Sequence, residues 1–343
     1  GVTLGTTDPP RHDRLRGLIQ HAFNKRNLDY IEGHIRDAAQ TAIAGFADKK
    51  SFDFVEDFSS KVTVKVLFRL LGLPPGDDNI VRDKAVLMVQ SDPVTRQKGP
   101  EHLAAFEWVK SYAEKVIAER RANPGEDLIS QFSLAEIDGD RLSEREVLLT
   151  TTTLIMAGIE SLGGFMTMFA LNMADYPDAR RRCVENPALL ADAIEESLRY
   201  NTSAQRFRRC LTTDTELHGQ AMKAGDFVCL AYGSGNRDER RFANPDIYDV
   251  DRKPKGHLGF GGSVHACLGT AIARLATKLA FEELHKALPN YTRVDADLPW
   301  MPSTTFRSPL QRQKIDRADR EGDEDAHDEA DRNDEGVGNE ARQ

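Results

Sequence analysis

A single cysteine in a glycine-rich loop is the residue of this 343-residue chain best placed to do chemistry. Cys267 follows Gly261 and Gly262 and precedes Gly269, and a helix-forming run begins directly after it. The positive end of a helix should favour the thiolate, the form of cysteine that ligates metals and acts as a nucleophile. A free cysteine at such a junction is more often a small buried hydrophobe, so Cys267 alone leaves both interpretations open.

The neighbours of Cys267 favour metal ligation. Glycines let the backbone approach a flat ligand, and His265 places a hydrogen-bond donor two residues before the sulfur. The stretch 260–269, FGGSVHACLG, resembles the haem-thiolate loop of the cytochrome P450 family, in which the cysteine binds iron. Ser263 stands where that family usually has glycine, and we expect about 1 kcal/mol of strain if the position requires a positive φ.

An acid and an alcohol lie inside an apolar helical stretch, residues 154–161, LIMAGIES. A mid-helix glycine costs about 1 kcal/mol relative to alanine, and an acid is costly to bury, so this conflict favours a functional site over a solvated helix face. The stretch resembles the family's central helix. The resemblance implies that Ala157 and Gly158 leave room beside the haem, and that Glu160 and Ser161 relay protons. Serine replaces the commoner threonine and keeps the hydroxyl.

Glu196 and Arg199 stand three residues apart on one face of a predicted helix. Such pairs are common on exposed helices and contribute little there. Their position before the cysteine loop resembles the family's Glu-x-x-Arg element, a structural ion pair that supports the haem loop and does not react. Residues 242–249 resemble the family's meander, the irregular segment before the cysteine loop. Ile247 there occupies a position where many members carry arginine, so we expect Arg252 to be the third partner of the Glu196–Arg199 pair.

Two basic residues four apart follow a Pro-Pro pair near the start of the chain. In residues 8–16, DPPRHDRLR, a helix would place His12 and Arg16 on one face, which suits carboxylates; ordinary surface charge is the alternative. The motif resembles the family's propionate-binding helix. The resemblance as a whole implies haem b, with Cys267 as the metal ligand and these cofactor-binding residues: His12, Arg16, Ala157, Gly158, Arg209, Phe260, His265, Cys267 and Gly269.

The resemblance also implies a substrate pocket. Its candidate lining residues, taken from the central helix, the segment after the ion-pair helix and the chain near residue 305, are Leu154, Ala204, Gln205, Phe207, Thr305 and Phe306.

Helical periodicity dominates the elements that must position these residues. Apolar residues at three- and four-residue spacing predict helices over 28–46, 58–71, 102–121, 143–175 and 187–200. Short β-like stretches lie at 209–217 and 227–231. The expected fold is mainly α with small β-sheets.

Composition excludes several classes of function. We find no apolar run near the roughly 20 residues of a membrane span and no basic, aromatic-interleaved stripe for nucleic acid. The other cysteines, Cys183, Cys210 and Cys229, lack metal-site spacing and suggest no disulfide framework. We therefore expect a cytoplasmic protein without membrane or nucleic-acid partners.

The acidic residues concentrate at the end of the chain. Residues 313–343 hold twelve Asp and Glu against five Lys and Arg, within a total net charge of −9. Few apolar residues there could be buried. The sequence thus predicts a haem-thiolate domain over 1–310 and an acidic, disordered tail over 311–343.

The function implied by the resemblance is monooxygenation. One atom of O₂ would enter a small organic substrate, with electrons from a ferredoxin or flavodoxin and its reductase, because the chain has no nucleotide-phosphate loop. The Asp-Pro-Pro motif begins seven residues after the start of the chain, where the family usually has several dozen, so we expect a form lacking the first sheet strands and the substrate-roof loop. A haem-binding remnant without coupled activity is the alternative.

Overall fold

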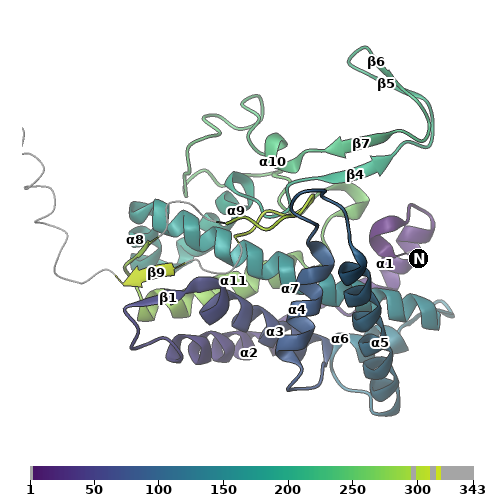
Figure 1. Cartoon of the computed structure of the whole chain (residues 1–343), viewed down its shortest axis with the longest axis horizontal. Coiled ribbons are helices and arrows are strands. Elements are labelled where there is room, and N and C mark those ends of the chain that lie inside the picture. The colour runs from purple at the N-terminus through teal and green to yellow at the C-terminus, as the bar shows by residue number, and fades with distance from the viewer. Residues whose placement is uncertain (1–2, 295–298, 310–313, 318–343) are drawn as a thin grey trace, which may run out of the picture.

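The computed structural model describes residues 3–294, 299–309 and 314–317 and is mainly helical (Figure 1). The longer helices are α1 (Arg11–Gln20), α2 (Lys25–Ala44), α3 (Ser60–Leu71), α4 (Asp78–Val89), α5 (Pro100–Ala122), α6 (Leu128–Leu134), α7 (Glu144–Asp175), α8 (Pro177–Glu185), α9 (Leu190–Tyr200) and α11 (Thr270–Ala287), and α10 (Tyr232–Gly235) is a single turn.

Nine short strands form four small antiparallel sheets within the described ranges. The three-stranded sheet has the order β1 (Ser51–Asp53), β9 (Lys314–Arg317), β8 (Tyr291–Arg293). The two-stranded sheets are β2 (Glu136–Ile137) with β3 (Asp140–Arg141), β4 (Phe207–Cys210) with β7 (Phe227–Leu230), and β5 (Thr215–Leu217) with β6 (Gln220–Met222). This architecture confirms the predicted fold class.

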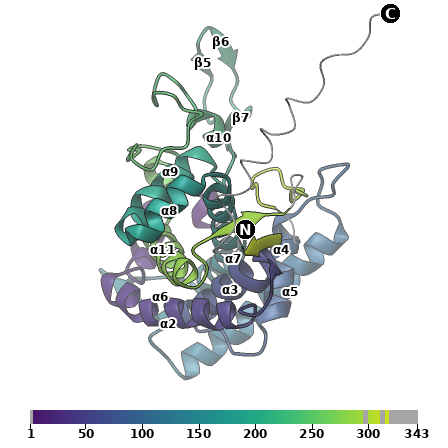
Figure 2. The same cartoon turned by 90° about the vertical axis from the view of Figure 1, so that its left-hand side faces the viewer.

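Helix α7 is the central element of the fold, with α3, α4 and α5 packed on it (Figures 1 and 2). It begins at a capping box in which the Ser143 hydroxyl accepts the Glu146 N–H while the Glu146 carboxylate accepts the Ser143 N–H. By length and composition this 32-residue helix could cross a membrane, but 61% of its most apolar window is buried inside the protein. It therefore serves as the core helix, and its middle carries the acid-alcohol pair.

Several element boundaries differ from the sequence-based prediction. The helix expected from residue 58 is preceded by a π-helical turn, Phe54–Ser59, capped by the Asp53 carboxylate. The strand expected over 209–217 divides into β4 and β5, which belong to different sheets. The periodicity did not indicate α4, α6 or α8. In α8 the run of charged residues hides the pattern, because only Arg180 and Cys183 are buried.

Residues 314–317 correct the predicted domain boundary at residue 310. They form β9, the middle strand of the three-stranded sheet, where Ile315 pairs with Phe52 and Arg293. Ile315 is 1% exposed, so this single apolar side chain lies in the core although its neighbours in sequence are charged. The rest of the predicted acidic tail lies outside the described residues.

Candidate active site

A cavity of about 410 Å³ lies between α7, α3, α1 and the cysteine loop. Helix α7 contributes small and hydroxyl-bearing side chains, whereas α3 contributes aliphatic ones. The lining residues include His12, Arg16, Leu67, Thr150, Thr153, Leu154, Ala157, Gly158, Ser161, Ala204, Phe207, Arg209, Phe260, His265, Cys267, Gly269 and Phe306. The structure thus brings residues from both ends of the chain to one apolar chamber.

The loop before α11 presents Cys267 to this cavity. The Cys267 N–H donates to the Phe260 carbonyl at 2.9 Å, and the Thr270 hydroxyl donates to the Cys267 carbonyl at 2.7 Å. Ser263 has a φ of 58°, so this position does require the left-handed conformation for which the sequence predicts strain. Serine pays about 1 kcal/mol for that conformation, and the loop retains its turn nonetheless.

Arg16 ties the cysteine loop to α1. Its guanidinium donates to the carbonyl of Ala266 at 2.8 Å and to that of Val264 at 3.2 Å. These bonds reach across 250 positions of sequence and hold the residue just before Cys267. Helix α1 and the loop therefore form one wall of the cavity.

The acidity of Cys267 differs from the expectation drawn from the helix N-terminus. Its thiol is accessible from the cavity, yet desolvation by the surrounding protein raises its pKa, and the Gly269 N–H, the Thr270 hydroxyl and two arginines offset this only in part. The helix start thus does not by itself produce a thiolate. A coordinated metal ion does, because it deprotonates a ligating thiol.

The four cationic groups predicted to bind propionates all line the cavity. The rings of His12 and His265 meet edge to face with centroids 4.6 Å apart. His12 is 1% exposed, and its Nε2 has no hydrogen-bond partner within the described residues. An orphaned buried nitrogen beside Arg16 and Arg209 is the environment that a carboxylate ligand would complete.

Close packing explains the glycine in the middle of α7. A Cβ on Gly158 would stand 2.7 Å from the Leu67 side chain of α3, so a larger residue would require Leu67 to move. Ala157 and Ser161 line the cavity beside it, and the Ser161 hydroxyl donates to the Ala157 carbonyl one turn earlier. The small residues of α7 therefore both open the cavity and allow α3 to close it.

Glu160 points to a different neighbour. It is not among the cavity-lining residues; its Oε1 accepts a hydrogen bond of 2.9 Å from the Ser308 hydroxyl. Burial raises the pKa of the Glu160 carboxyl to about 7, and the bond from Ser308 lowers it less than burial raises it. The carboxyl thus exchanges a proton near neutral pH.

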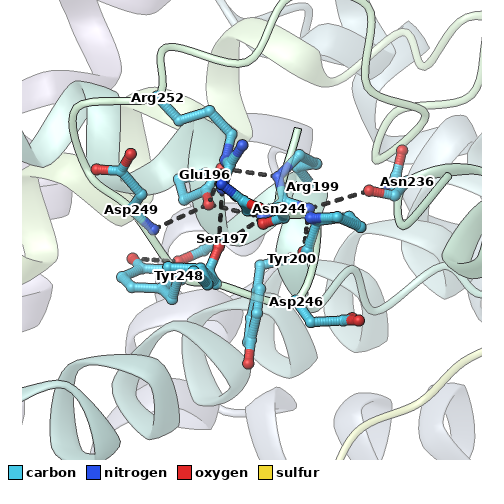
Figure 3. Close-up of polar contacts among 12 residues, drawn as sticks. Glu196, Ser197, Arg199, Tyr200, Asn236, Asn244, Asp246, Tyr248, Asp249 and Arg252 are labelled. Atoms are coloured by element: carbon cyan, nitrogen blue, oxygen red, sulfur yellow. Dashed lines mark hydrogen bonds and ion pairs between the residues drawn. The ribbon is translucent and has the colours of Figure 1, made fainter. Parts of the chain in front are cut away.

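The predicted ion pair is at the centre of a buried network (Figure 3). Arg199 donates to both carboxylate oxygens of Glu196, at 2.8 and 2.7 Å, and both side chains are 0% exposed. Arg252 donates to Glu196 Oε1 at 3.0 Å, which makes it the third partner expected from the sequence. Arg199 also donates to the carbonyls of Asn236 and Pro245, so α9 is fixed to the meander before the cysteine loop.

The predicted substrate residues divide into two groups. Leu154, Ala204, Phe207 and Phe306 line the cavity. Gln205 and Thr305 do not: they meet through a backbone bond of 2.9 Å, and the Gln205 amide turns to the Thr202 carbonyl. Gln205 and Thr305 are thus held by the contact between the two segments and do not line the cavity.

Sequence reasoning missed the lining contributed by α3 and by the start of the central helix. Val66, Leu67, Leu70 and Leu71 come from α3, and Thr150 and Thr153 come from α7. The periodicity of residues 60–71 predicts a helix with an apolar face. It does not say that part of this face borders a cavity, because core packing and cavity lining require the same side chains.

A mainly helical fold that turns one cysteine and a cluster of cations toward an apolar chamber defines a haem-thiolate protein. Among the described residues no three His, Cys, Asp or Glu side chains gather into another metal site. Comparison with known proteins agrees with this class. The family model described as cytochrome P450 matches residues 83–288.

Individual relatives give the same result. The methyl-branched lipid omega-hydroxylase of Mycobacterium tuberculosis is 35% identical over 290 residues, which cover 82% of this chain and 68% of that protein. The structure of the Bacillus subtilis bacillaene polyketide synthase cytochrome P450 PksS gives a TM-score of 0.87 at 29% identity, over 92% of this chain and 81% of that one. P450BioI in complex with a hexadec-9Z-enoic acid-ligated acyl carrier protein gives 0.85 at 27% identity, over 92% and 81%.

The chain belongs to the cytochrome P450 family. It is a haem-thiolate monooxygenase, an oxidoreductase that acts on an organic substrate and O₂ with electrons from a redox partner. The residues of the cavity fit haem: a thiol, an apolar chamber, the unpartnered Nε2 of buried His12 and the cationic side chains of Arg16 and Arg209 are all present.

Proposed function

We propose that Cys267 is the haem ligand of this chain and that the substrate reacts in the cavity beside α7. The main support for this proposal is that the Cys267 thiol lines the same cavity as four cationic side chains, those of His12, Arg16, Arg209 and His265. Phe260 and Gly269 would border the haem on the cysteine side, and Ala157 and Gly158 on the opposite side. When bound, the haem supplies the oxidising chemistry by which one atom of O₂ enters the substrate.

Glu160 and Ser161 are the proposed proton relay. Ser161 Oγ lines the cavity and would donate its proton there after releasing the Ala157 carbonyl. A proton from Glu160 would then restore the hydroxyl by way of water, because successive side chains of a helix do not face each other, and Glu160 would be reprotonated from solvent. A carboxyl with a pKa of about 7 suits this role, because it gives up and regains a proton at neutral pH at similar cost.

The substrate is proposed to present a hydrocarbon segment to the reaction site. The cationic side chains that line the cavity within the described residues are the four assigned to propionates, which leaves hydroxyls such as Thr150 and Thr153 and apolar groups for the substrate. Two relatives are described by apolar chains, a methyl-branched lipid and a hexadecenoic acid on an acyl carrier protein. We therefore propose a lipid-like chain as the substrate class.

The proposed electron donor is a ferredoxin or flavodoxin with its reductase, and the proposed location is the cytoplasm. The absence of a nucleotide-phosphate motif in the sequence supports a separate donor. The burial of most of the apolar window of α7 supports a core role for that helix rather than a membrane anchor.

Turnover with a surrogate ferredoxin, its reductase and a series of fatty acids tests the function. We expect oxygenated product from at least one acid in proportion to NADH consumed. In Ser161→Ala the protein should bind haem as before, while product per NADH falls about tenfold or more and peroxide rises, because one proton donor contributes roughly 10²- to 10⁴-fold. Consumption of NADH that yields only peroxide with the unaltered chain would favour the haem-binding remnant without coupled activity.

A further inference from the structure

The proton relay has a neighbour outside the family motifs. Ser308 lies in the segment 299–309, 148 positions after Glu160, and its hydroxyl donates to Glu160 Oε1 at 2.9 Å. Ser308 is 4% exposed. No other hydrogen bond or ion pair of the Glu160 carboxyl occurs within the described part of the chain. One hydroxyl therefore sets the direction in which this carboxyl points.

The backbone of Ser308 is held rigidly in place. Its carbonyl accepts the Met301 N–H at 2.9 Å, and the preceding residue, Arg307, donates its N–H to the Ser203 carbonyl at 2.8 Å. The pairs Trp300 with Pro309 and Ala204 with Phe306 form isolated β-bridges on either side. A side chain on such a fixed segment can position a partner at low entropic cost.

Helix α7 is shaped to admit this contact. A Cβ on Gly164, one turn after Glu160, would stand 3.0 Å from Ser308 Cβ and 3.8 Å from Glu160 Oε1. A larger residue there would move Ser308 away from the carboxyl. The absence of a side chain at this position lets the 299–309 segment approach the helix where the acid lies.

We propose that Ser308 is a positioning residue for the proton relay: its hydroxyl holds the Glu160 carboxyl in one orientation on α7, one residue before Ser161. This inference rests on the proposed relay function of Glu160. Without the hydroxyl, the carboxyl loses its one fixed partner and gains rotamer freedom, so proton delivery becomes slower relative to loss of peroxide.

The first readout needs no turnover. The carboxyl C=O stretch of Glu160, assigned by its loss in Glu160→Gln, is followed by infrared difference spectroscopy across pH in the holoenzyme. Because the bond from Ser308 favours the carboxylate, Ser308→Ala should move the midpoint of this titration upward, and Ser308→Thr should restore it. An unchanged midpoint in Ser308→Ala would overturn the proposal.

The second readout is coupling. Ser308→Ala should lower product per NADH by about tenfold, the effect of one hydrogen bond to an ionisable group, with Ser308→Thr close to the unaltered enzyme. Ser59→Ala is the matched control, because it removes another buried serine hydroxyl bonded to α7, at Thr167, and should leave coupling unchanged. Normal coupling in Ser308→Ala with poor coupling in Glu160→Gln would reject the positioning role alone. Normal coupling in both would reject the relay itself.

Discussion

Single side chains in this protein take their chemistry from what surrounds them. Glu160 would be an ordinary surface acid on an exposed helix, but burial against the 299–309 segment brings its pKa to about 7. The pKa of Cys267 is raised by the same cause, desolvation by the surrounding protein. Its place at a helix start suggests an acidic thiol, and the protein around it raises its pKa.

The shifted pKa of Glu160 predicts how stability depends on pH. The folded protein holds the proton more tightly than the unfolded chain, whose glutamate titrates near 4.5, so the stabilisation is complete below that pH and is lost as pH rises to about 7. The free energy of unfolding of the unaltered protein, relative to that of Glu160→Gln, should therefore decrease by at most roughly 3 kcal/mol between pH 5 and 7. Thermal midpoints of the two proteins measured across this pH range would show the decrease. A difference that stays constant or grows with pH would contradict this assignment.

At this scale the motifs were predictable and the long-range partners were not. Residue type and spacing singled out Cys267, Ser161 and Arg252. The first two line the cavity, and Arg252 bonds to Glu196. Ser308 could not be found in this way, because a serine after an arginine has no distinctive pattern and its contact spans 148 positions. Nor does residue type show that Gln205 and Thr305 bond across two segments instead of lining the cavity.

Helix α9 is the element whose position depends most on one interaction. The Glu196 and Arg199 side chains are fully buried, and Arg199 also bonds to the meander. Removing one partner would leave the other charge buried without compensation, which typically costs about 3 to 5 kcal/mol.

Glu196→Ala should therefore destabilise the holoenzyme by about 3 kcal/mol and lower its haem content, because the meander that leads to the cysteine loop loses its anchor. Glu185→Ala is the control, since Glu185 pairs with Arg181 on α8 with both side chains more than half exposed. That change should cost less than about 0.5 kcal/mol. Chemical denaturation and the haem absorbance per protein measure both effects. Equal losses in the two variants would show that the buried network has no special role.

Elements with a clear apolar period could be predicted to within a few residues, as α5 and α7 illustrate. The prediction failed where tertiary contacts replace periodicity. The charged helix α8 buries little, and the segment over 209–217, in which Asp214 indicates a turn, divides between two sheets.

Strand β9, near the end of the described residues, lies between β1 and β8 and so joins distant parts of the chain in one sheet. The composition of residues 311–343 indicates a solvated tail, but Ile315 pairs with β1 and β8 in the core sheet. The high charge of residues 311–343 taken together hides a buried apolar residue, Ile315. Composition therefore could not predict where the folded part of the chain ends.

A pair of shortened chains tests this boundary. A chain ending at Arg317 should keep the thermal midpoint of the full chain. A chain ending at Pro309 should have a lower midpoint and a free energy of unfolding smaller by at least about 2 kcal/mol, because the burial of Ile315 is lost and β1 and β8 lack the strand between them. Equal thermal midpoints for the two shortened chains would place the end of the folded domain before β9.

Haem ligation by Cys267 is tested most directly by the carbon monoxide difference spectrum of the reduced, haem-loaded protein and of its Cys267→His variant. We expect a strongly red-shifted Soret band for the unaltered chain, because thiolate ligation by Cys267 produces it, and a band at the position of imidazole-ligated haem for the variant. A red-shifted band in Cys267→His, or its absence in the unaltered chain with haem bound, would contradict the assignment of Cys267 as the haem ligand.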